Sequence, residues 1–250
     1  FVTLSGATTC VVPDHDRGFD FVEMVSRIAR ESATLEHIIV LGEAPTGTHS
    51  LTSLIETTAK QPASTLDEIE IDPLDPAVFQ LSGGTTGIPK LIPRTHNDYA
   101  YNSKQAGVVT EIEEGSCLLL VLPIAHNLPL ACPAMQGFMF RGAKVVLSTS
   151  AAAPDVFALV EKHRITHIHV VPALLIGWIN DPTISNYDLS SLKMIQSGGQ
   201  RLQPEVRLKT RNLIPSVFVQ ENFGMSEGVI MFIRRGDPEE VLLETSGRPV

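Results

Sequence analysis

Residues 81–96 read LSGGTTGIPKLIPRTH and combine the residue types that bind phosphate. Glycines lack a Cβ and let backbone N–H groups approach an anion, Thr85 and Thr86 add hydroxyl donors, and Lys90 adds a positive charge. The loop follows a short apolar run, and α/β folds place ligands at such strand ends. It differs from the P-loop of nucleotide triphosphatases, in which Gly directly precedes Lys, because Pro89 stands before Lys90. An ordinary glycine-rich turn is the alternative interpretation.

Three further segments place polar side chains next to apolar runs. They are LPIAHNLPLACP (122–133), QSGGQRL (196–202) and QENFGMSEG (220–228). The last contains Glu227, and a carboxylate is a ligand that Mg²⁺ takes together with phosphate oxygens. Taken singly, each segment also fits a simpler interpretation: a polar pair in a loop, a turn after a strand, or a surface glutamate after a turn.

In this order, the four segments resemble the signatures of the acyl-adenylate-forming enzymes. SGGTTGIPK resembles the phosphate loop of that superfamily, and FGMSEG resembles its YGxTE motif, with Phe223 and Ser226 in the places of Tyr and Thr. PKLIPRTHNDY and AHN look most like the stand-alone aryl acid adenylating enzymes, the 2,3-dihydroxybenzoate and salicylate AMP ligases of siderophore and nonribosomal peptide biosynthesis. The resemblance runs along essentially the whole chain.

The resemblance implies a two-step ligase reaction. An aryl carboxylate attacks the α-phosphate of ATP to give an aryl-AMP and pyrophosphate, and the aryl group then passes to the phosphopantetheine thiol of a carrier protein. The implied cofactors are ATP and Mg²⁺, with Glu227 as the Mg²⁺ ligand. The implied catalytic residues are Lys90, His126, Ser226 and Glu227. The implied ATP- and phosphate-binding residues are Ser82, Gly83, Gly84, Thr85, Thr86, Gly87, Lys90, Gly199, Phe223 and Gly224.

The resemblance also implies a set of substrate-binding residues, namely Asn127, Leu128, Cys132, Gly198, Gln200, Asn222 and Ile230. Asn127 is uncharged and suits a substrate without an α-amino group, and its amide can donate to or accept from a phenol. Cys132 favours salicylate over dihydroxybenzoate, since a thiol is a weak partner for a second hydroxyl. Gln200 and Asn222 depart from the family pattern of small or apolar residues. Buried amides need polar partners, so a hydroxypicolinate or an aminobenzoate is a third alternative.

Other chemistries receive less support from the residues. His167 and His169 lie on one side of a predicted strand, as two metal ligands would, but no further ligands cluster beside them in the sequence. We interpret them as structural. Nothing near Cys132 indicates an activated thiolate, so pocket lining is favoured over a nucleophilic role. Two alternative functions stay open: an acyl-CoA ligase of the same superfamily, or an ATP-binding piece without activity of its own.

Strand-length apolar runs alternate with segments of helical periodicity along the chain. Strands are predicted in the first run (1–12) and at 37–41, 78–81, 117–123, 143–148, 166–172, 192–197 and 217–220; helices are predicted at 19–32, 97–109, 154–163, 173–180 and 204–213. Several strands are apolar almost throughout, as expected where helices cover both faces of a sheet. The pattern predicts an α/β fold of mostly parallel sheets flanked by helices, a piece of the large N-terminal domain of an adenylate-forming enzyme.

Composition narrows the partners and the compartment. The chain has 250 residues, 43% apolar and 19% charged, which is a globular balance, and its net charge of −9 argues against a nucleic-acid partner. No apolar run reaches the roughly 20 residues of a membrane span, so no membrane partner is expected. Three scattered cysteines indicate reduced thiols and a cytoplasmic protein.

Both ends of the chain look cut. We expect residues 1–250 to be the central part of the large N-terminal adenylation domain, with the N-terminal start and the small C-terminal domain absent. Residues 59–77 are acidic, contain three prolines and form the best linker candidate. By resemblance, an Asp that binds ribose and a Lys on the C-terminal domain would lie beyond the chain. These 250 residues alone should therefore adenylate poorly or not at all.

Overall fold

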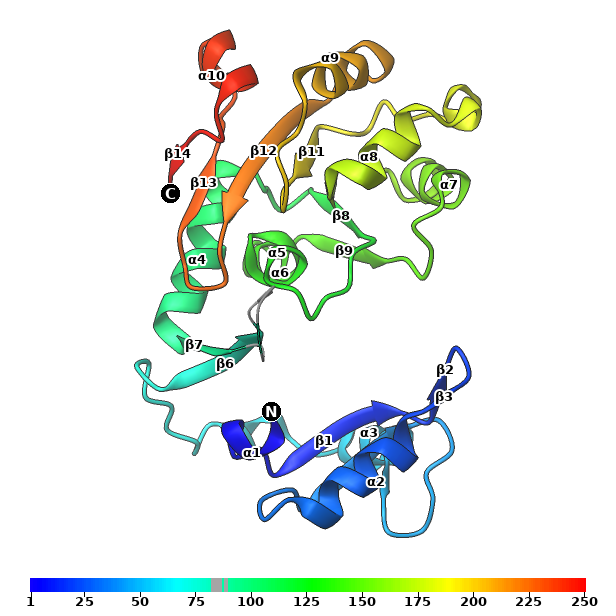
Figure 1. Cartoon of the computed structure of the whole chain (residues 1–250), viewed down its shortest axis with the longest axis vertical. Helices are drawn as coiled ribbons and strands as arrows, with labels where there is room; N and C mark the ends of the chain where they lie inside the picture. Colours follow the sequence, from blue (N-terminus) through cyan, green and yellow to red (C-terminus); the bar gives the residue numbers. More distant parts are fainter. Residues whose placement is uncertain (82–86, 88–89) are drawn as a thin grey trace. The chain divides into compact units, whose positions relative to one another are not determined.

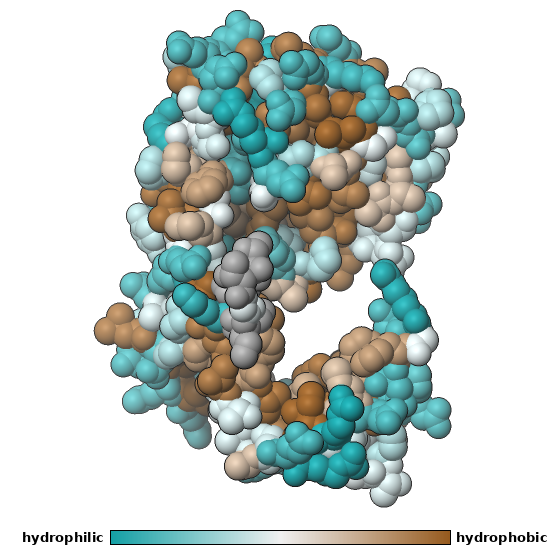
Figure 2. Space-filling model, in the orientation of Figure 1, coloured by the Kyte–Doolittle hydropathy of each residue, from teal (hydrophilic) through white to brown (hydrophobic). Residues whose placement is uncertain are grey.

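A computed structural model describes residues 1–81, 87 and 90–250. The chain forms two compact units, residues 1–72 and 73–250, and each is considered by itself. The boundary falls inside the acidic segment 59–77. Both units expose hydrophilic and hydrophobic residues side by side (Figure 2). None of the helices among the described residues has the length and apolar character that crossing a membrane requires.

The first unit is built on a small parallel sheet. Its strands pair in the order β1 (Thr9–Pro13), β4 (His37–Leu41) and β5 (His49–Ser50), and β2 (His15–Asp16) pairs antiparallel with β3 (Phe19–Asp20). The helices are α1 (Val2–Ser5), α2 (Phe21–Glu31), α3 (Leu51–Thr58) and the 3₁₀ helix η1 (Ala63–Leu66). The buried core of this unit joins Val25 of α2 to Val12 and Val40 of the sheet.

One strand prediction in this unit is wrong in its extent. Residues 1–12 were expected to form one apolar strand, but Val2–Ser5 form α1 and the strand begins at Thr9. Gly6 adopts a left-handed conformation with φ 65°, which ends the helix before the strand begins. The periodic segment 19–32 does contain the expected helix, α2.

The second unit holds a seven-stranded sheet in the order β14-β13-β12-β11-β10-β8-β9. The strands are β8 (Cys117–Leu120), β9 (Lys144–Leu147), β10 (His167–Val170), β11 (Met194–Ser197), β12 (Phe218–Gly224), β13 (Ile230–Phe232) and β14 (Arg248–Pro249). The five strands from β9 to β12 pair in parallel, and β13 and β14 extend the sheet antiparallel. The five predicted strands of this sheet are present, whereas β13 and β14 escaped prediction.

Helices cover both faces of this sheet. They are α4 (His96–Val109), α5 (Asn127–Ala131), α6 (Ala134–Phe140), α7 (Ala153–His163), α8 (Pro172–Ile179), α9 (Pro204–Leu213) and α10 (Glu239–Glu244), with the 3₁₀ helix η2 (Pro182–Asn186). Figure 1 shows α9 beside β12 and α4 beside β13. The expected helices α4, α7, α8 and α9 are present, and α5, α6 and α10 are additional.

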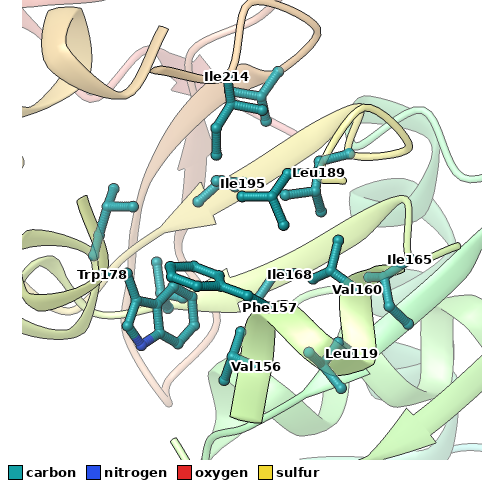
Figure 3. Close-up of a cluster of buried hydrophobic side chains, with 14 of the residues drawn as sticks. Leu119, Val156, Phe157, Val160, Ile165, Ile168, Trp178, Leu189, Ile195 and Ile214 are labelled. Atoms are coloured by element: carbon teal, nitrogen blue, oxygen red, sulfur yellow. The ribbon is translucent and has the colours of Figure 1, made fainter. Parts of the chain in front are cut away.

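Alternate residues of the strands fill two separate cores. Leu119 of β8 faces the large cluster in which α7, α8 and α9 pack, where Val156, Phe157, Ile168 and Trp178 meet (Figure 3). Leu118 and Leu120 face the opposite side and pack with Phe138 of α6. Because neighbouring residues of a strand point to opposite faces, a strand buried on both faces is apolar throughout, as the sequence predicted.

A hairpin precedes the sheet and carries the predicted phosphate loop. β6 (Pro76–Leu81) pairs antiparallel with β7 (Leu91–Thr95), and residues 82–90 stand between the two strands in the sequence. β7 passes directly into α4, whose first turn is capped because the Thr95 hydroxyl accepts from the backbone N–H of Asp98 at 3.2 Å. The hairpin therefore links the loop to a long helix that packs on the rest of the unit.

Candidate active site

A cleft of about 560 Å³ lies at the carboxyl ends of parallel strands β8, β11 and β12. It is lined by His126, Asn127, Leu128, Cys132, Gly199, Asn222, Gly224, Met225, Ser226 and Glu227. These residues come from three segments that the sequence singled out, separated by about 70 and 20 residues of chain. Parallel α/β sheets place ligands at this edge, so the fold explains why the segments meet.

The short helix α5 presents His126 and Asn127 to the cleft. His126 caps the helix, and its Nδ1 accepts a hydrogen bond from the backbone N–H of Leu128 at 3.2 Å. An acceptor Nδ1 places the proton of a neutral imidazole on Nε2. His126 can therefore offer an N–H donor to an anionic oxygen in the cleft.

Asn127 is held by a buried chain of hydrogen bonds. The Tyr99 hydroxyl donates to Asn127 Oδ1 at 2.9 Å, and Gln80 Nε2 donates to the Tyr99 oxygen at 3.1 Å. All three side chains are at most 7% exposed. Burial raises the pKa of Tyr99 to about 12, so its hydroxyl keeps its proton. The chain fixes the amide of Asn127 at the wall of the cleft.

Arg94 is buried and supports the segment of the cleft that contains Ser226 and Glu227. Its buried guanidinium forms an ion pair with Asp98 and donates to the Ser226 carbonyl oxygen at 2.9 Å. The same guanidinium lies 5.3 Å from the centre of the Tyr99 ring. The residue before Glu227 is thereby tied to the strand that follows loop 82–90.

Glu227 is an exposed carboxylate on a tight turn at the cleft. The turn is closed by hydrogen bonds from Gly228 N to Met225 O at 3.1 Å and from Met225 N to Val229 O at 3.0 Å. No group of three or more His, Cys, Asp or Glu side chains is placed to hold a metal within the described part of the chain. A single carboxylate fits Mg²⁺ that is bound mainly through nucleotide phosphates and water.

Asn222 and Gly198 are fitted to each other. A Cβ on Gly198 would lie 2.1 Å from Asn222 Oδ1, so only glycine leaves room for the amide. Asn222 Oδ1 is buried without a hydrogen-bond partner, although the residue lines the cleft. Cys132 lies on the same cleft, and burial raises the pKa of its thiol to about 12, which keeps it neutral.

Several predicted site residues lie elsewhere. Gln200 is exposed and is not part of the cleft lining, and the residue before it, Gly199, has φ 84°. Phe223 is also exposed outside the lining, and Ile230 is buried against Cys132. Gly87 and Lys90 are exposed. Ser82, Gly83, Gly84, Thr85 and Thr86 lie outside the described residues.

Sequence reasoning missed three residues that hold the site together: Gln80, Arg94 and Tyr99. Arg94 and Tyr99 stand inside the segment PKLIPRTHNDY, which carried the resemblance. The one available signal was the spacing of Arg94 and Asp98, which suits an ion pair on one side of a helical turn.

All 250 residues match the model of a protein family described as AMP-binding enzyme. The chain belongs to the AMP-binding enzyme family. It is 36% identical over its full length to a 2,3-dihydroxybenzoate-AMP ligase of Bacillus subtilis, and 37% identical to a salicyl-AMP ligase / salicyl-S-ArCP synthetase of Mycobacterium tuberculosis. The chain covers 45% and 43% of these two proteins, which is less than half of either.

The fold agrees with a solved structure of a related protein. The apo structure of MbtA from Mycobacterium smegmatis superposes with a TM-score of 0.84 at 36% identity, over 99% of this chain and 44% of that one. This confirms the predicted fold class, an α/β piece of the large N-terminal domain of an adenylate-forming enzyme. The family resemblance of the motifs is confirmed as well.

Proposed function

We propose that the protein containing this AMP-binding chain activates an aromatic carboxylic acid with ATP and passes it to a carrier-protein thiol. The observation that carries the proposal is the cleft itself, which brings His126, uncharged Asn127 and Glu227 together. The names of the two curated relatives, an aryl acid AMP ligase and a salicyl carrier-protein synthetase, support the same chemistry. The substrate, the cofactors ATP and Mg²⁺ and the cytoplasmic location are all part of the proposal.

In the first step, a carboxylate oxygen bonds to the α-phosphorus of ATP while the bond from that phosphorus to the bridging oxygen breaks, and pyrophosphate leaves. Two anions must be brought together, so the site has to position them and offset their charge. Lys90 and loop 82–90 would bind the β- and γ-phosphates, and Glu227 would hold Mg²⁺. When bound, the ion screens the charge that develops on the phosphate oxygens.

The remaining side chains would orient the acid. Nε2–H of His126 would donate to an anionic oxygen, and Asn127 would meet a substituent on the ring. In the second step, a thiol sulfur bonds to the carbonyl carbon of the aryl-AMP, the thiol proton passes to the solvent, and AMP leaves with the electrons of the broken C–O bond. The acceptor is proposed to be the phosphopantetheine thiol of an aryl or peptidyl carrier protein.

The cleft narrows the candidate acids without fixing one. Cys132 offers only a weak hydrogen bond and favours salicylate, while the Asn222 amide favours a second polar group on the ring. Salicylate, 2,3-dihydroxybenzoate and 3-hydroxypicolinate are therefore the leading candidates. Gln200 gives no support for a further polar contact with the acid, because it does not line the cleft.

The test is ATP–pyrophosphate exchange by the full-length protein with Mg²⁺ and each of these acids, 2-aminobenzoate and an aliphatic acid. Exchange with an aromatic acid is expected. Glu227→Gln should reduce it by roughly 100-fold, whereas Glu239→Gln on α10 should leave it unchanged. Exchange with the aliphatic acid alone would contradict the proposal, and ATP binding without exchange would indicate a binding module.

A separate assay identifies the acceptor. The adenylated acid is offered to a phosphopantetheinylated carrier protein or to coenzyme A, and thioester formation is followed by mass spectrometry. Loading of the carrier protein is expected. Efficient transfer to coenzyme A, with none to any carrier protein, would favour the acyl-CoA ligase alternative.

A further inference from the structure

The turn that carries Glu227 rests on a buried guanidinium group. Nη1 of Arg94 donates to the Ser226 carbonyl oxygen at 2.9 Å, across 132 residues of chain. On the other side of Glu227, a Cβ on Gly228 would lie 3.6 Å from Nη2 of Arg94, so the guanidinium also lies against the backbone of this glycine. The two residues that flank Glu227 therefore both contact the same side chain.

Arg94 is itself fixed by the start of helix α4. Its Nη2 donates to Oδ1 of Asp98 at 3.0 Å, and its Nε donates to Oδ2 of the same carboxylate. The guanidinium also lies 5.3 Å from the centre of the Tyr99 ring. A bidentate pair with a carboxylate fixes the plane of a guanidinium as well as its position. The direction in which Nη1 donates to the turn is therefore set by α4.

We propose that Arg94 is a positioning residue for Glu227, because it holds the turn of residues 225–229 where the carboxylate can meet Mg²⁺ bound to a nucleotide. Arg94 is 3% exposed and lies behind the residues that line the cleft, so it acts through the turn and not through a contact with the nucleotide. The inference rests on the proposed function, in which Glu227 holds Mg²⁺, and adds to it the residue that sets the place of this carboxylate.

The turn needs such support because its own bonds are few. Two backbone hydrogen bonds close it, from Gly228 to Met225 and from Met225 to Val229. Glu227 is exposed, and Gly228 has φ 124°, which side-chain-bearing residues rarely adopt. A single carboxylate supplies few of the ligands of Mg²⁺, so its contribution depends on groups that orient it from behind.

The guanidinium geometry explains why arginine occupies this position. Its five N–H groups lie in one plane, which lets Arg94 donate to Asp98 and to Ser226 at the same time. A lysine keeps the charge, but its donors sit on one nitrogen and cannot serve the carboxylate and the carbonyl in the same geometry. Arg94→Lys therefore tests the geometry while it keeps a cation beside Asp98.

The first measurement is calorimetric binding of ATP to the full-length protein, once with Mg²⁺ and once with EDTA. Arg94→Lys should weaken the binding of MgATP by roughly 10-fold and leave the binding of ATP in EDTA unchanged. The control is Arg164→Lys, because Arg164 belongs to an exposed ion pair with Asp188. This control should change neither affinity. A purely structural role of Arg94 would instead weaken both forms of ATP alike.

The second measurement places Arg94→Lys in the background of Glu227→Gln. Because Arg94 acts through the Glu227 carboxylate, Arg94→Lys should weaken MgATP binding by less than about twofold in that background. Asp98→Asn loosens the hold of α4 on Arg94 at a position that is 48% exposed. It should weaken MgATP binding in the same direction, even if Arg94→Lys fails to fold.

Amide hydrogen exchange reports on the turn without any metal or nucleotide. The peptide that contains residues 225–229 should exchange faster in Arg94→Lys and in Asp98→Asn than in the unchanged protein, because the turn opens more often. Peptides from α8 should exchange as before in both variants, since α8 does not contact Arg94.

Two results would overturn the inference: unchanged MgATP binding in both Arg94→Lys and Asp98→Asn, or fully additive effects of Arg94→Lys and Glu227→Gln. Either leaves the proposed function standing, because that function is decided by exchange with an aromatic acid in the unchanged protein. Absence of exchange with every aromatic acid would overturn the proposed function, and MgATP binding would still decide whether Arg94 positions Glu227.

Discussion

Asn222 occupies the space that Gly198 leaves open, and the two residues should be energetically coupled. The backbone of Gly198 permits a side chain, so the obstacle to Gly198→Ala is the 2.1 Å approach of its Cβ to the amide. We expect this variant to lower the free energy of unfolding by about 1–3 kcal/mol. The loss should largely disappear in the background of Asn222→Ala, which empties that space.

Urea unfolding followed by the fluorescence of Trp178, the single tryptophan, measures the stability of the second unit. The control is Gly177→Ala in α8, where a Cβ meets nothing within 4 Å and little change is expected. An equal cost of Gly198→Ala with and without Asn222 would show that the two residues are not coupled.

His169 should make the second unit sensitive to acid. Burial lowers its pKa to about 3, and burial also lowers the pKa of neighbouring His167 to about 4, both from 6.5. Below pH 6.5 these histidines bind protons in the unfolded chain but stay neutral in the folded chain. The free energy of unfolding therefore decreases as the pH falls. Each histidine should lower it by about 1.4 kcal/mol per pH unit until the pKa in the folded chain is reached.

The test compares unfolding free energies at pH 7, 6 and 5 for the unchanged chain and for His169→Met. The ring nitrogens of His169 are buried without partners, so methionine removes no hydrogen bond. The pH dependence of its unfolding free energy should be shallower than that of the unchanged chain by the contribution of one histidine. Identical slopes for His169→Met and the unchanged chain would disprove the linkage.

A buried ion pair between Arg207 and Glu221 connects helix α9 to strand β12. Their charged atoms are 2.8 Å apart, and the side chains are 2% and 3% exposed. Burial raises the pKa of Glu221 even with Arg207 beside it, so the desolvation cost is large. Glu221→Gln leaves a buried charge without its partner and should cost about 3–5 kcal/mol.

An exposed ion pair of the same chain provides the matched control for this buried pair. Arg164 and Asp188 are 2.7 Å apart, but their side chains are 60% and 49% exposed. Asp188→Asn should therefore cost less than about 1 kcal/mol. The double variant Arg207→Met/Glu221→Leu should recover most of the stability lost by Glu221→Gln. Equal costs for the buried and exposed variants in urea unfolding would refute the argument.

The elements that the sequence predicted are those with a uniform environment. β8, β10 and β11 are buried on both faces, and α2 has an apolar face, so each leaves a continuous or periodic pattern. β7 escaped because Pro93 and Arg94 interrupt its apolar run. The sequence gives no reason for a buried arginine at position 94, because the Ser226 carbonyl that accepts its hydrogen bond lies 132 residues further along the chain.

The residues of the site also differ in how far the sequence could predict them. The segments that line the cleft could be picked out because their residue types carry chemistry and resemble a known family. Gln80 and Tyr99 could not, since a glutamine in a strand and a tyrosine in a helix have no local signature. Their function depends on pairings over 19 and 28 residues of chain, which only the fold brings together.

For the whole molecule, the two compact units predict where a protease cuts first. The boundary at residues 72 and 73 lies within a stretch, residues 52–77, in which every residue is exposed. That stretch contains one basic residue, Lys60, so limited trypsin digestion should first produce a fragment that begins at Gln61. Trp178 fluorescence should be unchanged after this cut, because the core around Trp178 lies within residues 73–250. Lys60→Gln should slow the first cleavage, and a first cut inside residues 97–250 in the unchanged chain would show that the second unit is less compact than its core indicates.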